Sequence, residues 1–170
     1  EINRLGLCLE EYIDYLEAHS TFSLVTSDKA GEWCLGDWCA PNILYPDKDI
    51  TFCEQQVFIP APMVNTYFMI KSLNQMAEIA KIIGCDGDIE EYTAKAEERK
   101  KALVAAYYST YDRNFFMNIH GANAFGIDLG LGVDKTYEFL VAYYQKLGHY
   151  DTGIFGTDIL TRVLFEKGDG

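Results

Sequence analysis

The stretch from 62 to 111 constrains the fold most strongly, because it reads as two helices joined by a short connection. In its first half, 62–83, apolar side chains recur every three to four residues, as they do along one face of an α-helix. These side chains are Met69, Leu73, Met76, Ala80 and Ile83. Gly84 follows as a natural helix end, since glycine readily adopts the left-handed backbone of a C-cap. Because only residues 85–87 separate it from the second helix, the two helices are expected to be antiparallel neighbours.

Similar patterns predict helices elsewhere in the chain. The expected ranges are 3–18, 88–111, 121–131, 135–147 and 158–167. Asp88 and Glu91 have the spacing of a capping box that would start the second helix of the hairpin. Thr157 is the candidate N-cap of the last helix, and Gly148 and Gly168 are natural ends for the last two. This arrangement predicts an all-α fold of antiparallel helical hairpins.

The range 20–60 breaks the helical pattern. It contains both tryptophans and three of the five cysteines, with short β segments possible at 22–26 and 56–59. Loops longer than about 15 residues are uncommon in compact domains and usually functional. Short turns on one side and a long aromatic-rich loop on the other suggest a ring of hairpins whose long loops build a cleft.

Charge and hydropathy exclude two classes of partner. The formal net charge is −12, and the densest basic run, 99–101, directly follows two glutamates, as on a solvated helix face. Nucleic-acid binding usually leaves a basic stripe, so no nucleic-acid partner is expected. No apolar run approaches the roughly 20 residues of a membrane span, so no membrane partner is expected either.

The cysteines do not suggest a disulfide framework, because they are odd in number and scattered. Their use favours a reducing, cytoplasmic compartment but leaves export open. The histidines lie far from them in sequence, whereas zinc sites commonly use close ligand pairs. Neither a metal nor a cofactor is therefore expected.

The segment 32–41 contains the side chains best suited to binding a ligand. It pairs an acid with an indole twice, as Glu32-Trp33 and Asp37-Trp38, five residues apart. An indole face can stack on the apolar face of a sugar ring, and a neighbouring carboxylate can accept hydrogen bonds from sugar hydroxyls. The structural alternative is that both tryptophans anchor the loop in a helical core.

Two histidines adjoin glycine turns. His120 precedes Gly121, so it is either a ligand contact or a residue at the start of a helix with a satisfied hydrogen bond. His149 follows Gly148 and is expected to cap the preceding helix.

Three motifs, in order along the chain, resemble the bacterial α-L-rhamnosidases, a glycoside hydrolase family. They are Gly36-Asp37-Trp38 with Ala40-Pro41, the run 121–132 (GANAFGIDLGLG), and the run 151–160 (DTGIFGTDIL). The hairpin at 62–111 also looks like that of the family. The resemblance covers essentially the whole chain and implies that residues 1–170 form roughly half of an (α/α)₆ toroid, a partial catalytic domain.

The resemblance also implies hydrolysis of terminal α-L-rhamnosides by inversion, in which one carboxyl protonates the leaving oxygen and another activates water. The family carries the acid upstream and the base downstream in a Trp-Glu pair. Glu32-Trp33 has the reversed order, so no catalytic residue is assigned to this chain, and alone it is expected to be inactive. The expected partners are a rhamnose-containing glycoside or oligosaccharide and the remainder of the catalytic domain. The expected substrate-binding residues are Trp33, Asp37, Trp38, Gly153, Phe155 and Thr157.

Two other functions remain open at this point. A helical-repeat interaction module would suit the hairpin, but self-similarity at about 34–45 residues is missing. Another sugar-active enzyme on the same toroid is the second alternative, and the run 151–157 favours a rhamnosidase over it.

Overall fold

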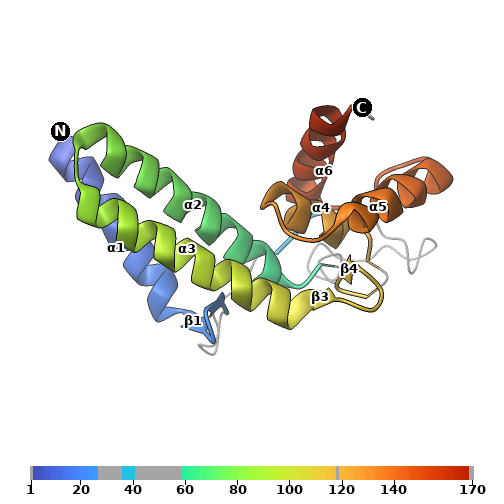
Figure 1. Ribbon diagram of the computed structural model, residues 1–170, viewed down its shortest axis with the longest axis horizontal. Helices are drawn as coiled ribbons and strands as arrows, with labels where there is room; N and C mark the ends of the chain where they lie inside the picture. The colour runs from blue at the N-terminus through green and yellow to red at the C-terminus, as the bar shows by residue number, and fades with distance from the viewer. Residues whose placement is uncertain (1, 27–35, 41–58, 118, 169–170) are drawn as a thin grey trace.

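The computed structural model describes residues 2–26, 36–40, 59–117 and 119–168, and within these ranges it is mainly helical (Figure 1). The helices are α1 (Ile2–Ala18), α2 (Ala61–Ile83), α3 (Asp86–Tyr107), α4 (Gly121–Asp128), α5 (Asp134–Leu147) and α6 (Ile154–Lys167). The strands in the described ranges form two short antiparallel ladders, β1 (Ser20–Thr21) with β2 (Leu24–Val25) and β3 (Tyr108–Ser109) with β4 (Asn114–Phe115). The predicted all-α class is confirmed.

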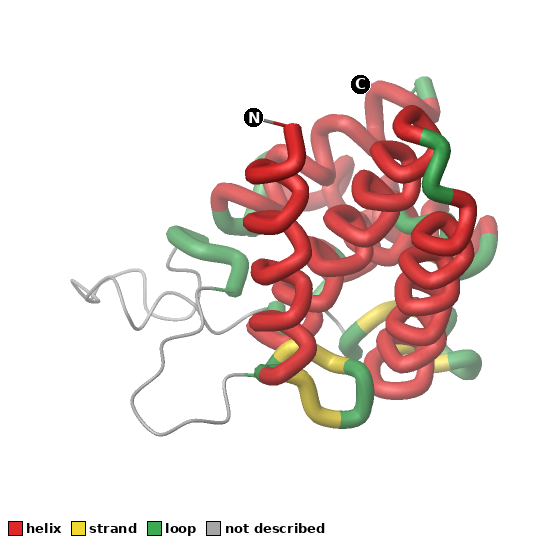
Figure 2. The backbone as a smooth tube through the Cα atoms, turned by 90° about the vertical axis from the view of Figure 1, so that its left-hand side faces the viewer, coloured by secondary structure: helices red, strands yellow, loops and turns green. Residues whose placement is uncertain are grey.

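The helices form two groups (Figure 1). α2 and α3 make the predicted antiparallel hairpin, and α1 lies along it, with the turn between α2 and α3 close to the N-terminus. α4, α5 and α6 gather at the other end of the hairpin, where the chain ends. Figure 2 shows both ladders at the same lower side of the molecule, beneath the helices. The site described below lies in the second group.

Three predicted glycine stops are confirmed, because Gly84, Gly148 and Gly168 all have left-handed backbones, with φ of 78°, 77° and 89°. In α2 and α5 the N–H of the glycine bonds to the carbonyl of the residue four positions earlier, Ala80 or Tyr144. Each stop therefore satisfies a carbonyl that the last helical turn leaves without a partner.

The predicted start and end of α3 are wrong. The helix begins at Asp86 with Cys85 as N-cap, and no side chain caps it, so the capping box expected from Asp88 and Glu91 does not form. Asp86 and Asp88 instead place negative charge in the first turn, where the helix dipole favours it. The helix stops at Tyr107 rather than at 111, because Tyr108 and Ser109 pair with β4.

The predicted start of α6 is also wrong. The N-cap is Gly153, so α6 begins four residues before the predicted 158 and Thr157 lies inside its first turns. α4 ends at Asp128 rather than at 131. Of the two predicted β segments, 22–26 is represented by β2, which a turn at residues 22–23 joins to β1, whereas 56–58 lie outside the described residues. The cap of α5 is Gly148 itself, not His149.

α2 is the centre of the core, with Met69, Ile70 and Leu73 fully buried. α4 packs between α2 and the last two helices, and its first six residues are all buried. Gly126 permits this packing, since a Cβ there would lie 2.2 Å from Cε2 of the buried Phe115 ring. Among the described helices, none is long and apolar enough to cross a lipid bilayer.

A buried carboxylate links three of the helices. Asp128 at the end of α4 accepts a hydrogen bond from the Tyr67 hydroxyl of α2 at 2.6 Å. It also pairs with Lys71 of α2 at 3.1 Å and with Arg162 of α6 at 2.9 Å. Its side chain is 4% exposed, so these contacts offset the desolvation of its charge.

Candidate functional site

Asp37 caps the N-terminus of α6 from a loop 116 residues earlier in the chain. One carboxylate oxygen, Oδ2, accepts the backbone N–H of Gly153 at 2.7 Å, and the other, Oδ1, accepts that of Gly156 at 2.8 Å. These N–H groups are donors that a helix cannot satisfy internally, and the positive end of the helix dipole favours an anion there. Asp37 is 3% exposed, so this contact is part of the protein interior.

Trp38 joins the same contact through its backbone. Its carbonyl accepts the N–H of Ile154 at 2.7 Å. A Cβ on Gly153 would lie 2.3 Å from that carbonyl oxygen and 2.4 Å from the carbonyl oxygen of Asp37. A Cβ on Gly156 would lie 2.5 Å from Asp37 Oδ2. Glycine at both positions is therefore what allows the two loops to approach so closely.

The environment of Asp37 raises the pKa of its carboxyl. Burial is the largest cause, since it penalises the charged form, and the nearby negative charge of Asp151 adds to it. The backbone hydrogen bonds from Gly156, Gly153 and Phe155 act in the opposite direction. The donors of α6 thus offset part of the cost of burying this carboxylate.

Asp151, in the loop before α6, is held by two tyrosines of α5. The Tyr144 hydroxyl donates to Asp151 Oδ1 at 2.6 Å, and the Tyr143 hydroxyl donates to Oδ2. Burial, followed by this hydrogen bond, raises the pKa of Tyr143 to about 12. The same causes raise the pKa of Tyr144, which is more deeply buried. Both hydroxyls therefore stay protonated donors over the physiological range.

His120, at the N-cap of α4, stacks on Tyr143 with the ring centroids 4.5 Å apart and the planes at 23°. Its Nδ1 atom is buried, and no hydrogen-bond partner for it lies in the described ranges. Burial lowers the pKa of His120, and the charge of Asp151 opposes that shift. Next to it, Gly121 leaves room for Thr152, whose Cγ2 would lie 2.5 Å from a Cβ at that position.

Three loops therefore meet at one place, at residues 36–40, 119–121 and 148–156, and we call this the three-loop cluster. Its principal side chains are those of Asp37, Trp38, His120, Tyr143, Tyr144, Asp151 and Thr152. Asp37 and Asp151 are both engaged by internal donors. The arrangement is suited to holding a loop and presenting its side chains, rather than to transferring protons.

The structure brings together most of the residues that the sequence singled out. Asp37 and Trp38 lie against Gly153, as expected, and Trp38 is half-buried. Phe155 turns towards α2, where its ring meets Phe68 edge-on at 5.0 Å. The hydroxyl of Thr157 forms a hydrogen bond with that of Thr152 at 2.9 Å. Trp33 lies outside the described residues.

Sequence reasoning did not single out Asp151, Tyr143 and Tyr144. Asp151 opens the run 151–160, and Tyr143 and Tyr144 lie eight and seven residues before it. The available signal was therefore an acidic residue close in sequence to two tyrosines. Its pairing depends on how α5 and the following loop fold back on one another. Local sequence patterns do not predict this tertiary geometry.

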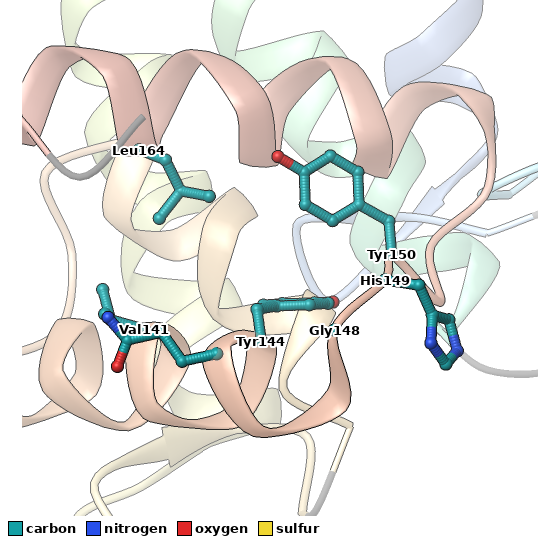
Figure 3. A pocket seen from close by; sticks show the side chains of 7 residues that line it. Val141, Tyr144, Gly148, His149, Tyr150 and Leu164 are labelled. Carbon is teal, nitrogen blue, oxygen red and sulfur yellow. The ribbon is translucent and has the colours of Figure 1, made fainter.

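A hollow of about 330 Å³ lies beside the three-loop cluster, between α5 and α6 (Figure 3). Tyr144 projects from α5 and Tyr150 from the loop before α6, with their rings edge-on at 5.6 Å. The remaining lining residues are Val141, Gln145, Gly148, His149 and Leu164. In the ranges that the structure describes, no three His, Cys, Asp or Glu side chains are grouped as a metal site requires.

Comparison with known proteins relates this geometry to carbohydrate-cleaving enzymes. The model of the bacterial alpha-L-rhamnosidase 6 hairpin glycosidase domain matches residues 8–170. An α-L-rhamnosidase structure from Dictyoglumus thermophilum superposes with a TM-score of 0.70 at 18% sequence identity. The match covers 95% of this chain and 18% of that chain, so this chain spans less than a fifth of that enzyme. A search of curated proteins by sequence found no match.

The two matches agree with each other and with the helical hairpins described above. The family match extends over nearly the whole chain, and the structural match shows the same fold. Both set aside the helical-repeat alternative. The chain therefore belongs to the bacterial α-L-rhamnosidase family and carries part of its six-hairpin glycosidase fold.

Proposed function

We propose that this chain is the pocket-bearing segment of an α-L-rhamnosidase that removes terminal α-L-rhamnose from glycosides or oligosaccharides. The observation that carries the proposal is the contact between Asp37-Trp38 and the N-terminus of α6. It unites, in one place, two of the motifs by which the sequence resembles the family. Family membership and the fold support the same reaction class.

Trp38 is the proposed platform for the sugar. Its backbone is fixed by Ile154, while its side chain is half-buried. An indole face that stays partly open can stack on the apolar face of a deoxy sugar such as rhamnose. Trp33, five residues earlier in the sequence, is proposed as a second aromatic contact.

Asp37 organises the loop. Both of its oxygens are bound to backbone N–H groups, so the geometry supports a role in organising the loop rather than the role of acceptor for sugar hydroxyls. Gly153, Phe155 and Thr157 form the rim of the pocket in this proposal. Their described contacts with Asp37, Phe68 and Thr152 make that rim rigid.

The acid and the base are proposed to lie on other segments of the enzyme. Inversion requires two carboxyl groups on opposite sides of the scissile bond, about 6.5–9.5 Å apart, with room for water. Asp37 and Asp151 both belong to the three-loop cluster and are both occupied by internal donors. In this account the 170 residues form roughly half of the toroid.

The proposal is tested with an aryl α-L-rhamnoside, comparing the 170-residue chain with the parent enzyme that contains it. The parent enzyme should release the aryl group, and its Trp38→Ala variant should do so with a lower kcat/KM. Tyr111→Ala, at a side chain that is 92% exposed, is the matched aromatic control and should retain activity. The isolated chain should show no turnover.

Parent-like turnover by the isolated chain would mean that the catalytic carboxyls lie within it, contrary to the proposal. A parent enzyme that cleaves other glycosides but not rhamnosides would favour the alternative of a different sugar-active enzyme on the same toroid.

A further inference from the structure

We infer that Asp151 is a positioning residue for Trp38, acting through the turn at the start of α6. The inference deepens the proposed function, because it rests on Trp38 being the sugar platform. The position of Trp38 is set by a continuous path of contacts from α5 to the loop that carries it.

The path begins on a rigid helix. α5 is anchored by Leu140, which is fully buried, and by Tyr144, which is 7% exposed. The hydroxyls of Tyr143 and Tyr144 each donate to a different oxygen of Asp151. Two donors on neighbouring residues fix both the place and the orientation of this carboxylate.

Thr152 transmits that position to the turn. It is 5% exposed, and it fills the space that Gly121 leaves by lacking a Cβ. Its hydroxyl is bonded to that of Thr157 at 2.9 Å, so it is tied to the first turns of α6 as well. Little freedom therefore remains between Asp151 and the residue that meets the other loop, Gly153.

The turn then holds the loop that carries Trp38. The N–H groups of Gly153 and Gly156 bind the Asp37 carboxylate, and the N–H of Ile154 binds the Trp38 carbonyl. Gly153 lies so close to the Asp37 and Trp38 carbonyls that a shift of the turn must move them. Losing the Asp151 contacts should therefore displace Trp38.

Asp151 also acts on Asp37 through its charge. Asp151 raises the pKa of Asp37 by its like charge, so the two acids are close enough to interact. The tyrosine hydroxyls partly stabilise the charge of Asp151 by hydrogen bonding.

Two substitutions of Asp151 should displace Trp38 to different extents. Asp151→Asn keeps the shape of the side chain and one acceptor, whereas Asp151→Ala removes both contacts and should displace Trp38 further.

The test uses the indole of Trp38 as its own reporter. The chain has two tryptophans, so Trp33→Phe leaves Trp38 as the single indole. In this background, Asp151→Ala should shift the fluorescence emission to longer wavelength and increase quenching by acrylamide. Asp151→Asn should shift it less. Asp158→Ala, at an α6 residue whose side chain is 80% exposed, is the matched control and should leave the spectrum unchanged.

Helix content by circular dichroism separates positioning from unfolding. A shifted Trp38 spectrum with unchanged helix content supports the inference, and an unchanged spectrum in Asp151→Ala overturns it. If Asp151→Ala loses its helix content, Tyr143→Phe and Tyr144→Phe decide instead, because each removes a single hydroxyl. A shift in these folded variants supports the inference, and no shift in either overturns it.

Kinetics of the parent enzyme separate this inference from the proposed function. If both hold, Asp151→Asn should raise KM for the aryl rhamnoside severalfold with a smaller effect on kcat. A spectral shift without any change in KM would leave the positioning role intact and contradict the role of Trp38 as sugar platform.

Discussion

The carboxylate of Asp37 accepts the backbone N–H of Gly153 at 2.7 Å across a sequence separation of 116 residues. A second oxygen of the same carboxylate binds Gly156. The start of α6 is thus defined by a side chain from a distant loop, and that loop carries the proposed sugar platform. The stability of the helix and the geometry of the site are therefore coupled.

The first prediction concerns this cap. Asp37→Ala should lower the free energy of unfolding by about 2 kcal/mol, because two buried N–H groups lose a charged acceptor while the cost of burying the charge is relieved. Urea unfolding followed by circular dichroism measures the change. Asp158→Ala, on the exposed face of α6, is the control and should change stability little. Equal stability of the two variants would show that the cap contributes nothing.

The second prediction concerns the packing of α4 on β4. Gly126→Ala should destabilise the protein by about 1–3 kcal/mol, because the new Cβ overlaps the buried Phe115 ring. Gly87→Ala in α3 is the matched control, since a Cβ there meets no atom within 4 Å. The control should be neutral or stabilising by up to about 1 kcal/mol, as alanine favours helix more than glycine does. Thermal unfolding of both variants checks the pair, and a loss in the control as large as in Gly126→Ala would contradict it.

The third prediction is a pH dependence from His120. Burial lowers its pKa in the folded protein, while the unfolded chain has a pKa near 6.5. The unfolded state therefore binds more protons just below pH 6.5, so stability falls as pH falls from 6.5 towards the lowered pKa. His120→Phe, which keeps a ring against Tyr143, should flatten this dependence. Identical slopes for wild type and His120→Phe would contradict this assignment.

The fourth prediction concerns Asp128. Asp128→Ala should cost about 2–3 kcal/mol, because the buried Tyr67 hydroxyl, Lys71 and Arg162 all lose their shared acceptor. Glu138→Ala removes an exposed ion pair with Lys135 and should change the free energy of unfolding by less than about 1 kcal/mol. Chemical unfolding at low and moderate salt measures both. A cost at Asp128 no greater than at Glu138 would refute the structural role of the carboxylate.

Local sequence predicted the parts of the fold that depend on local physics. The apolar face of α2 from 69 to 80 and the glycine stops at 84, 148 and 168 were predictable, because helical periodicity and left-handed backbones are properties of neighbouring residues. Ile83, predicted on the same face, is instead 56% exposed. The hairpin of α2 and α3 followed from its short connection. The all-α class and the family were also recognised from the sequence.

The starts of α3 and α6 were not predictable in this way. For α6, the pattern pointed to Thr157 as cap, but the acceptor is Asp37, which a local window does not include. The pairing of Asp151 with Tyr143 and Tyr144 is likewise tertiary. The proximity of Asp37 and Trp38 to Gly153 was expected from the motifs, whereas the binding of sugar by these residues stays a prediction.

Calorimetric titration of L-rhamnose into the parent enzyme tests most directly whether Trp38 is the rhamnose platform. Trp38→Ala should weaken binding about tenfold, because stacking of this kind contributes about 1.4 kcal/mol. Tyr111→Ala should bind as the parent enzyme does, and both variants should retain the helix content of the parent. Unchanged affinity for L-rhamnose in a folded Trp38→Ala variant would contradict the central claim.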